Sequence, residues 1–284
     1  MKKLILFVLF MSMILLAGCS SDPKDATKPI IFVSGGTEAM IVGGTFIEPV
    51  VTVTDNVDKD LIVIVSGDEL DIYNEGTYTI LYDAVDKSGN EADQKSFTVI
   101  VYAYSSDMDI LNGGFESGDL SGWTILEVNG SSDAFKDAFV ISTTNRKEGT
   151  YFFDGSMTDD DKVGAIRSSN FVLGGSGWIH FRLGGGNDIE HLYLGVYRAA
   201  DDTMIAKFAN VNPQKYGGNE FLVGYKFNLL TIPGLERGET LYIKVVDTKL
   251  ENWAIIKLDD IKTFHLMEPS NTTYETILNQ LPST

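Results

Sequence analysis

The sequence predicts an all-β protein made of two consecutive β-sandwiches. Runs rich in β-branched residues recur roughly every 10–15 residues with Gly, Asn and Asp between them, a pattern typical of antiparallel sandwiches. The 28 glycines suit a chain with many turns, and sustained helical periodicity is hard to find. A polar break at Ser105-Ser106-Asp107 separates the strand candidates into two groups, which indicates two domains.

The N-terminus predicts export and a lipid anchor. Two lysines precede an apolar run from Leu4 to Ala17, and the one cysteine of the chain, Cys19, follows closely. A positive start, a short apolar run and small residues before the cleavage point form a secretory signal, too short to span a membrane comfortably. The LAGC motif at 16–19 resembles the bacterial lipoprotein signal. That resemblance implies removal of residues 1–18, lipidation of Cys19 and a location on the extracellular face of the cell membrane. The alternative is an ordinary signal peptide.

The charge balance is strongly acidic, with 22 basic and 40 acidic residues and a net charge of −18. Removal of Lys2 and Lys3 with the signal leaves 20 basic residues against 40 acidic ones, a net charge of −20. No cluster of Lys and Arg is present, which argues against a nucleic-acid partner because phosphates are bound by grouped cations. No cysteine remains for disulfides, so each domain depends on its core or on a metal. Residues 19–27 form a short polar tether.

Residues 28–103 predict the first sandwich. Phe97, Val99 and Val101 alternate with polar or smaller neighbours, as in a strand with one buried face. The strand candidates of this unit lie at 29–35, 48–55, 60–67, 76–86 and 95–102.

Four motifs of this unit resemble the bacterial immunoglobulin-like repeat of surface proteins and of a pesticidal crystal toxin. They are GGTF at 43–46, VTDNVD at 53–58, GTYT at 76–79 and DKSGN at 86–90. The resemblance implies a spacer or adhesion module. Oxygen side chains in this unit are candidate ligands for calcium, and the alternative is a solvated, turn-forming loop. These candidates are Asp55, Asn56, Asp58 and Asp60.

Residues 109–265 predict a second, larger sandwich of the jelly-roll type. In WIHFRL at 178–183, the two-residue period places Ile179, Phe181 and Leu183 on one face, and Trp178, His180 and Arg182 on the other. The glycines on both sides of this run indicate turns, because a phosphate-binding loop would lead into a helix with Lys-Ser or Lys-Thr. The strand candidates lie at 162–174, 177–184, 191–198, 204–210, 239–247 and 253–266.

Several motifs of this unit resemble sugar-binding domains. NGGFESGDLSGW at 112–123 resembles the opening of bacterial carbohydrate-binding jelly rolls. RSSNF at 167–171 and LGGSGWIHFRLGGG at 173–186 resemble the fructan-binding module of levanase-type glycoside hydrolases. The resemblance implies a module that binds an extracellular polysaccharide, such as the fructan levan. The family usually has Gly-His after its late tryptophan, where this chain has Ala254-Ile255; the alternatives are a different ligand and a loss of sugar binding.

Sugars offer CH faces to aromatic rings and hydroxyl groups to charged side chains. The alternatives are structural, with Trp253 in the core, Asp247 capping a turn and Arg182 paired with a surface acid. The predicted ligand-binding residues are Trp178, Arg182, Asp188, Glu190, Tyr193, Asp247 and Trp253.

Glu116, Asp259 and Asp260 resemble the structural calcium site that ties the first strand of such jelly rolls to the last. Carboxylates suit Ca²⁺, and the alternative is an exposed Asp pair in a turn. We therefore treat Ca²⁺ as the candidate cofactor.

No catalytic motif is evident. The sequence has no Gly-x-Ser-x-Gly elbow, and His180, His191 and His265 lack metal-ligand spacing. The expected function is that of a non-catalytic, lipid-anchored surface protein that binds polysaccharide; its protein partners are unknown. The alternatives are an adhesion or structural protein that does not bind sugar, a hydrolase, and a remnant of a larger glycoside hydrolase. The tail at 266–284 resembles a linker or a disordered end.

Overall fold

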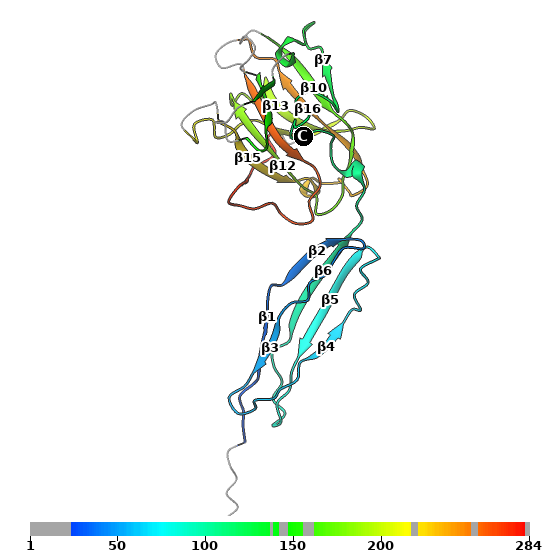
Figure 1. Cartoon of the computed structure of the whole chain (residues 1–284), viewed down its shortest axis with the longest axis vertical. Coiled ribbons are helices and arrows are strands. Elements are labelled where there is room, and N and C mark those ends of the chain that lie inside the picture. The colour runs from blue at the N-terminus through cyan, green and yellow to red at the C-terminus, as the bar shows by residue number, and fades with distance from the viewer. Residues whose placement is uncertain are drawn as a thin grey trace, which may run out of the picture. The chain divides into compact units, whose positions relative to one another are not determined.

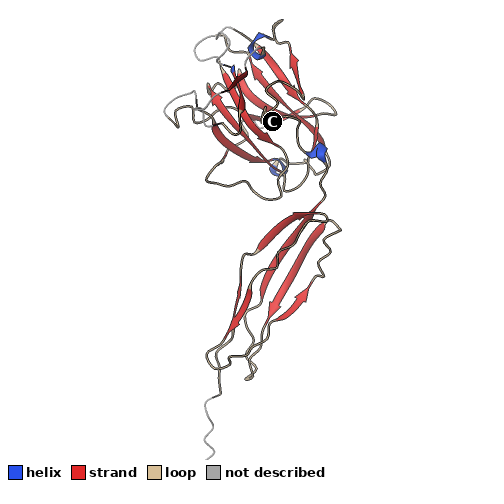
Figure 2. Ribbon diagram, viewed as in Figure 1, coloured by secondary structure: helices blue, strands red, loops and turns tan. Residues whose placement is uncertain are grey.

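The computed structural model describes residues 24–136, 139–141, 147–155, 162–216, 221–250 and 255–281, with backbone only at 139–141. Within these ranges the secondary structure consists of strands and short 3₁₀ helices (Figure 2). No helix in the described part of the chain has the length and apolar character needed to cross a membrane. The predicted all-β class is confirmed.

The N-terminal sandwich has two sheets (Figure 1). β1 and β3 form an antiparallel pair, and the other sheet has the order β2-β6-β5-β4. The sequence pattern did not indicate β2, whose residues TEAMI form a strand because they pair in parallel with β6. The strands are β1 (Ile30–Val33), β2 (Thr37–Ile41), β3 (Val51–Thr54), β4 (Ile64–Gly67), β5 (Gly76–Asp83) and β6 (Lys95–Tyr102).

The core of this sandwich is small. The alternation predicted in β6 is confirmed, since Phe97, Val99 and Val101 are all buried. By contrast, Ile30 and Phe32 of β1 are 69% and 59% exposed, so β1 leaves two large apolar side chains in solvent. The other buried apolar residues of the unit are Ile31, Met40, Tyr82 and Ala84.

The C-terminal sandwich is built from two larger sheets. One has the order β14-β13-β16-β10-β7, with β11 beside β16, and the other has the order β18-β15-β12-β17-β9-β8. The strands of the first sheet are β7 (Trp123–Leu126), β10 (Gly164–Ser168), β11 (Phe171–Val172), β13 (Leu192–Arg198), β14 (Met204–Phe208) and β16 (Thr240–Asp247). Those of the second are β8 (Phe139–Ile141), β9 (Tyr151–Asp154), β12 (Trp178–Gly185), β15 (Val223–Asn228), β17 (Ile256–Lys262) and β18 (Glu275–Thr276). The 3₁₀ helices are η1 (Ser106–Met108), η2 (Asp133–Phe135) and η4 (Leu229–Thr231).

The core of the C-terminal sandwich lies between these sheets. Ile179, Phe181 and Leu183 of β12 are buried in it, as the two-residue period predicts. Burial of a large apolar side chain contributes about 1.5–3 kcal/mol, so this core stabilises the unit without a disulfide. From the first sheet, Leu194, Val196, Ile243 and Val245 join the same cluster.

The glycines before β12 form a turn, as predicted, whereas Gly184 and Gly185, also expected in a turn, belong to β12 itself and pair with β17. Gly177 and Gly185 have φ angles of +79° and +88°, which residues other than glycine rarely adopt. A Cβ atom on Gly185 would lie 2.1 Å from the carbonyl oxygen of Ile255, which is too close. A larger residue at 185 would therefore force β12 and the residue before β17 apart.

The chain after β17 packs against the sandwich, so the expected linker or disordered end is wrong for residues 266–281. β18 pairs in parallel with β15, and Ile277 is only 3% exposed. The Lys207 N–H of β14 donates to Asn279 Oδ1 at 3.1 Å, and the Gln280 N–H donates to the Lys207 carbonyl at 2.9 Å. The tail was missed because these contacts depend on partners distant in the sequence rather than on a local pattern.

Candidate functional site

Four of the predicted ligand residues come together at one end of the sheet that contains β13 and β16. Leu192, the first residue of β13, pairs with Asp247, the last residue of β16. Beyond this pair, the Thr248 N–H donates to the carbonyl of His191 at 2.9 Å, so the β12–β13 loop lies beside the end of β16. We call this group the β13–β16 cluster; its members are Asp188, Glu190, Tyr193 and Asp247.

Cationic groups surround the carboxylate of Asp188. Lys249 Nζ lies 3.5 Å from Asp188 Oδ2, and His191 Nδ1 lies 3.1 Å from the same oxygen. Partial burial works against ionisation of Asp188, but the hydrogen bond to His191 and the charges of His191 and Lys249 outweigh it and lower its pKa. Asp247 is 3% exposed and accepts a hydrogen bond from the Lys249 N–H at 3.3 Å. This hydrogen bond gives Asp247 the turn-capping role named as its structural alternative.

Tyr193 and Glu190 share a lysine. Lys207 Nζ lies 4.3 Å from the centroid of the Tyr193 ring and 3.8 Å from Glu190 Oε2. The Tyr193 ring is half-buried and the Glu190 side chain is 73% exposed. A partly accessible ring beside an ammonium group and an exposed carboxylate gives a ligand both an apolar face and hydrogen-bonding groups.

More tyrosines continue from the cluster along the outward face of this sheet. The Tyr197 and Tyr242 rings stack with centroids 5.2 Å apart and an interplanar angle of 7°. The Arg167 guanidinium lies 3.9 Å from the Tyr242 centroid. Burial, with the neighbouring Tyr193, raises the pKa of Tyr197. The sequence analysis missed these tyrosines, although the two-residue period of β13 already placed Tyr197 on the face of Tyr193.

Trp178 and Arg182 lie elsewhere, on the outward face of β12 in the other sheet. Arg182 is 5% exposed, its Nε lies 3.2 Å from Asp260 Oδ2, and it also pairs with Glu148. Trp178 is half-buried, with Lys226 Nζ 5.4 Å from its ring centroid. Arg182 therefore has the structural role named as its alternative, that of an ion-pair partner; Glu148 is 57% exposed and Asp260 is 21% exposed.

The C-terminal tail covers this face of β12. Lys226 is fully buried, and its Nζ lies 2.7 Å from Glu268 Oε1 and donates to the Pro269 carbonyl at 2.5 Å. The Tyr274 ring stacks on the His180 ring with centroids 4.2 Å apart and an interplanar angle of 11°. A polar sheet face that would otherwise meet solvent is thus closed by the chain itself.

Under the tail lies a pair of histidines that the sequence spacing did not indicate. The rings of His180 and His265 have centroids 4.7 Å apart, and His180 Nε2 lies 3.1 Å from Asp260 Oδ1. The Tyr274 hydroxyl donates to Asp260 Oδ2 at 2.5 Å. Burial first, and then the charges of His180 and Lys262, lower the pKa of His265 to about 4. His265 is therefore neutral at physiological pH.

The three residues predicted to bind calcium in this sandwich do not form one ligand set. Glu116 Oε1 accepts a hydrogen bond from the Thr150 N–H at 2.9 Å, and Asp259 Oδ2 accepts one from the Glu148 N–H at 2.6 Å. Asp260 faces the histidines instead. Burial raises the pKa of Asp259 to about 7. Glu116 and Asp259 therefore both accept backbone N–H groups from the same segment, at 148–150.

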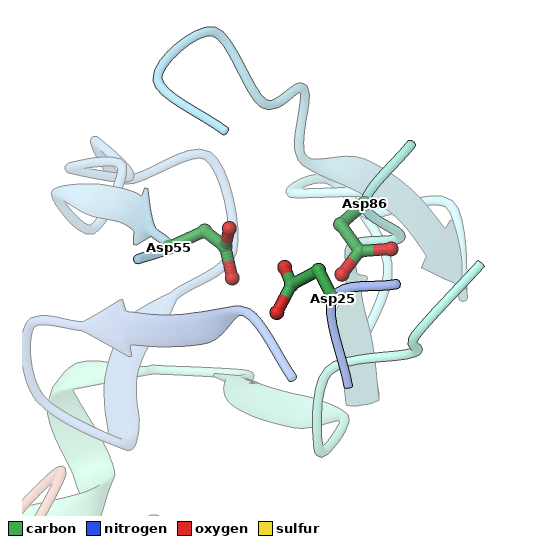
Figure 3. Close-up of side chains that lie close together, drawn as sticks. All are labelled: Asp25, Asp55 and Asp86. Carbon is green, nitrogen blue, oxygen red and sulfur yellow. The ribbon is translucent and has the colours of Figure 1, made fainter. Parts of the chain in front are cut away.

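A different acidic group is found in the N-terminal sandwich. One carboxylate oxygen from each of Asp25, Asp55 and Asp86 lies within 4.8 Å of the others, and Figure 3 shows the three side chains converging. Among the described residues no other group of three His, Cys, Asp or Glu ligands is this compact. Such a triad could hold a metal ion.

Hydrogen bonds keep two of these carboxylates ionised. The backbone N–H groups of Asp58 and Val57 lower the pKa of Asp55. Burial tends to raise the pKa of Asp86, but hydrogen bonds from Asn90 outweigh it and the net shift is downward. Asp55 and Asp86 therefore both carry negative charge at neutral pH.

A family model described as "Bacterial surface protein, Ig-like domain" matches residues 33–101. The N-terminal sandwich is a bacterial surface Ig-like domain. This agrees with the resemblance seen in its motifs. A search of curated proteins finds no match.

Solved structures similar to the chain include carbohydrate-binding modules. One, described as showing the structural basis for the promiscuous specificity of such modules from the β-sandwich superfamily, is 14% identical over 84% of this chain and 98% of its own, with a TM-score of 0.35. A second, CBM27-1 of Caldicellulosiruptor saccharolyticus in complex with mannohexaose, is 14% identical over 53% of this chain and 94% of its own, with a TM-score of 0.33.

A third similar structure is the K3 cleaved adhesin domain of Lys-gingipain from Porphyromonas gingivalis. It is 14% identical over 54% of this chain and 98% of its own, with a TM-score of 0.32. Other matches come from enzymes. At these identities and TM-scores, the resemblance is one of β-sandwich architecture and says nothing about a ligand.

Two residues of the sequence analysis lie outside the described ranges. They are Cys19, the predicted lipidation site, and Trp253, a predicted sugar platform.

Proposed function

We propose that this chain is a non-catalytic cell-surface protein whose C-terminal sandwich binds an extracellular polysaccharide. The observation that carries the proposal is the β13–β16 cluster, in which the partly accessible Tyr193 ring adjoins Asp188, Glu190 and their lysine and histidine partners. An aromatic ring can accept the CH face of a sugar, and charged groups beside it can bond to hydroxyl groups. Trp253 follows the cluster in sequence and belongs to the proposed site.

A fructan such as levan is the ligand we propose to test first. Its support is the resemblance of the glycine-rich segment at 167–186 to fructan-binding modules. Because Ala254-Ile255 replaces the usual Gly-His, the bound glycan can differ from that of the family. Tyr197 and Tyr242 lie further along the same face but are only 7% and 5% exposed, so the proposed contact is centred on Tyr193.

Trp178 and Arg182 are not part of the proposed site. The tail covers their face of β12, and Arg182 is committed to two acidic side chains. We expect variants at these positions to lower stability rather than glycan affinity.

The Ig-like domain serves as a spacer in this proposal, and acyl chains on Cys19 hold the protein at the extracellular face of the cell membrane. Each buried CH₂ group contributes about 0.8 kcal/mol, so more than one acyl chain gives stable anchoring. Replacement of Cys19 by Ser should release the protein from the membrane fraction, and its retention there would contradict the anchor.

Affinity electrophoresis of the full chain in mild detergent, through gels that contain levan, inulin or an unrelated soluble glycan, tests the site. Tyr193→Ala should weaken binding about tenfold, or about 1.4 kcal/mol, because it removes the ring platform. Tyr73→Ala, at a 72% exposed tyrosine of the Ig-like domain, is the matched control. Equal retardation of both variants would rule out the β13–β16 cluster as the site, and release of sugar from any glycan would favour a hydrolase.

Adhesion through the Ig-like domain is the second candidate. Its support is the exposed apolar surface of that domain, which includes Ile30, Phe32 and Ile62, since exposed apolar groups mark protein contacts when they are contiguous. If the full chain folds but no glycan retards it, this candidate takes precedence.

A further inference from the structure

The acidic triad joins three separate segments of the Ig-like domain (Figure 3). Asp25 precedes β1, Asp55 follows β3 and Asp86 lies beyond β5. The antiparallel pairing of Ile30 with Thr54 brings the start of β1 beside the end of β3. Strand pairing thus gathers carboxylates that are far apart in the sequence.

Two oxygens of the triad are buried and have nothing to bond to. Oδ1 of Asp25 accepts the Thr27 N–H at 3.0 Å, and Oδ1 of Asp55 accepts the Val57 N–H at 2.9 Å, so each of these oxygens holds its own loop. Oδ2 of both residues is buried without a hydrogen-bond partner among the described residues. A buried, charged oxygen without a partner is costly, which indicates that a ligand completes the site.

The triad has no ion-pair partner among the described residues, and Lys59 Nζ instead lies 3.4 Å from the carbonyl oxygens of Asp55 and Asn56. None of the ion pairs in the described part of the chain involves Asp25, Asp55 or Asp86. The nearest acid in the sequence, Asp58, is already used, because it pairs with Lys87 Nζ at 3.2 Å and accepts the Lys87 N–H at 3.0 Å. Like charges this close repel one another unless a cation lies between them.

We propose that Asp25, Asp55 and Asp86 bind a calcium ion. Ca²⁺ takes oxygen ligands at about 2.3–2.6 Å, so ligands on opposite sides of one ion lie up to about 5 Å apart. The 4.8 Å limit within the triad fits that spacing. Zinc favours His and Cys, whereas the triad offers carboxylates alone. Backbone carbonyls and water complete the coordination.

The ligands proposed for this calcium site differ from those that the sequence predicted for the Ig-like domain. Asp55 is retained, whereas Asp58 pairs with Lys87 and Asp60 lies exposed. Asp25 was assigned to the tether, and no local motif linked it to Asp55. Pairing of β1 with β3 is needed to see the connection.

The ion would fasten the segment before β1 to the sandwich. Asp25 lies in the predicted tether at 19–27, and its carbonyl already accepts a hydrogen bond from Asn90 Nδ2 at 3.1 Å. Its Oδ1 lies 3.3 Å from the donor Asn56 Nδ2. With calcium bound, this end of the tether becomes a rigid continuation of the domain, so calcium outside the cell controls how freely the domain moves on its anchor.

Titration of CaCl₂ into the calcium-free full chain, held in mild detergent and followed by calorimetry, tests the proposal. Asp55→Asn keeps the Oδ1 that accepts the Val57 N–H but removes a charge, so we expect one binding event to weaken at least about tenfold. Asp60→Asn in the same loop is the matched control. Glu116→Gln, at the calcium site predicted for the other sandwich, should leave this event unchanged.

A second readout separates metal binding from a simple structural role. Protease cleavage between residues 19 and 28 should slow at least fivefold on addition of calcium in the wild type and in Asp60→Asn, but not in Asp25→Asn. The proposal is overturned if the wild type takes up no calcium at millimolar concentration. It is equally overturned if Asp25→Asn and Asp55→Asn bind calcium as tightly as the wild type.

Discussion

The two sandwiches compensate buried charge in different ways. In the C-terminal sandwich, Lys257 Nζ lies 3.0 Å from Asp154 Oδ1 with both side chains buried, and the buried Lys226 pairs with Glu268. In the Ig-like domain, three carboxylates converge, and none of them forms an ion pair with a described residue. Burying an ion is costly unless it is paired and hydrogen-bonded. The C-terminal sandwich therefore contains its own counterions, whereas in the Ig-like domain the proposed calcium ion would supply the counter-charge.

The hydrophobic core is also larger in the C-terminal sandwich than in the Ig-like domain. The C-terminal sandwich buries a large apolar cluster between two broad sheets, while the Ig-like domain leaves Ile30 and Phe32 mostly exposed. A small unit without disulfides has less apolar burial to draw on, so a bound metal matters more to it.

The largest expected effect is the loss of a buried counterion. Asp154→Ala leaves Lys257, which is 2% exposed, with an unpaired charge and should cost about 3–5 kcal/mol. Urea unfolding followed by tryptophan fluorescence measures this, because Trp123, Trp178 and Trp253 all lie within residues 109–265, the range predicted for the second sandwich. The matched control is Asp133→Ala, whose partner Lys136 is 54% exposed; it should lower stability far less, because surface ion pairs contribute little. Equal losses would remove the distinction between buried and surface pairs.

A smaller effect comes from acid. His265 has a pKa of about 4 in the folded protein against 6.5 for the free side chain. The unfolded state therefore binds more protons between these values, so stability is complete above pH 6.5 and falls as the pH drops toward 4. At about 1.4 kcal/mol per pKa unit, and allowing for partial exposure, this amounts to about 2 kcal/mol. His265→Gln should flatten this slope, and exposed His191→Gln should not; a parallel slope in all three proteins would contradict the burial of His265.

The smallest expected effect is a gain in stability rather than a loss. In EDTA, Asp55→Asn should leave the Ig-like domain at least as stable as the wild type, because repulsion within the triad is relieved. Calorimetry measures this in the transition that occurs without a change in tryptophan fluorescence. A clear destabilisation in EDTA would mean that the triad is satisfied by the protein itself, and the contrast between the two sandwiches would disappear.

Local patterns sufficed to predict much of the fold. Alternation in β6 and β12 predicted which side chains face the core, and the glycines at 174–177 predicted the turn before β12, whereas Gly184 and Gly185 belong to that strand. β2 and β18 were missed because their residues are not typical of strands and depend on pairing with β6 and β15. Local sequence does not encode such pairing.

The candidate site was predicted only in part. Asp188, Glu190, Tyr193 and Asp247 could be proposed from residue type and their places near strand ends, and the fold brings them together. Contacts over long sequence separations were not predictable, as for His180 with His265 or Asp25 with Asp55. Arg182 was proposed as a ligand residue because nothing in the sequence shows that the tail returns to cover it.

Isothermal titration calorimetry of the calcium-loaded full chain with levan, inulin and unrelated glycans tests the central claim most directly. The account predicts heat with at least one polysaccharide, lost in Tyr193→Ala and retained in Tyr73→Ala. Absence of heat with every glycan, from protein that still unfolds cooperatively, would contradict the polysaccharide-binding function and leave adhesion as the better account.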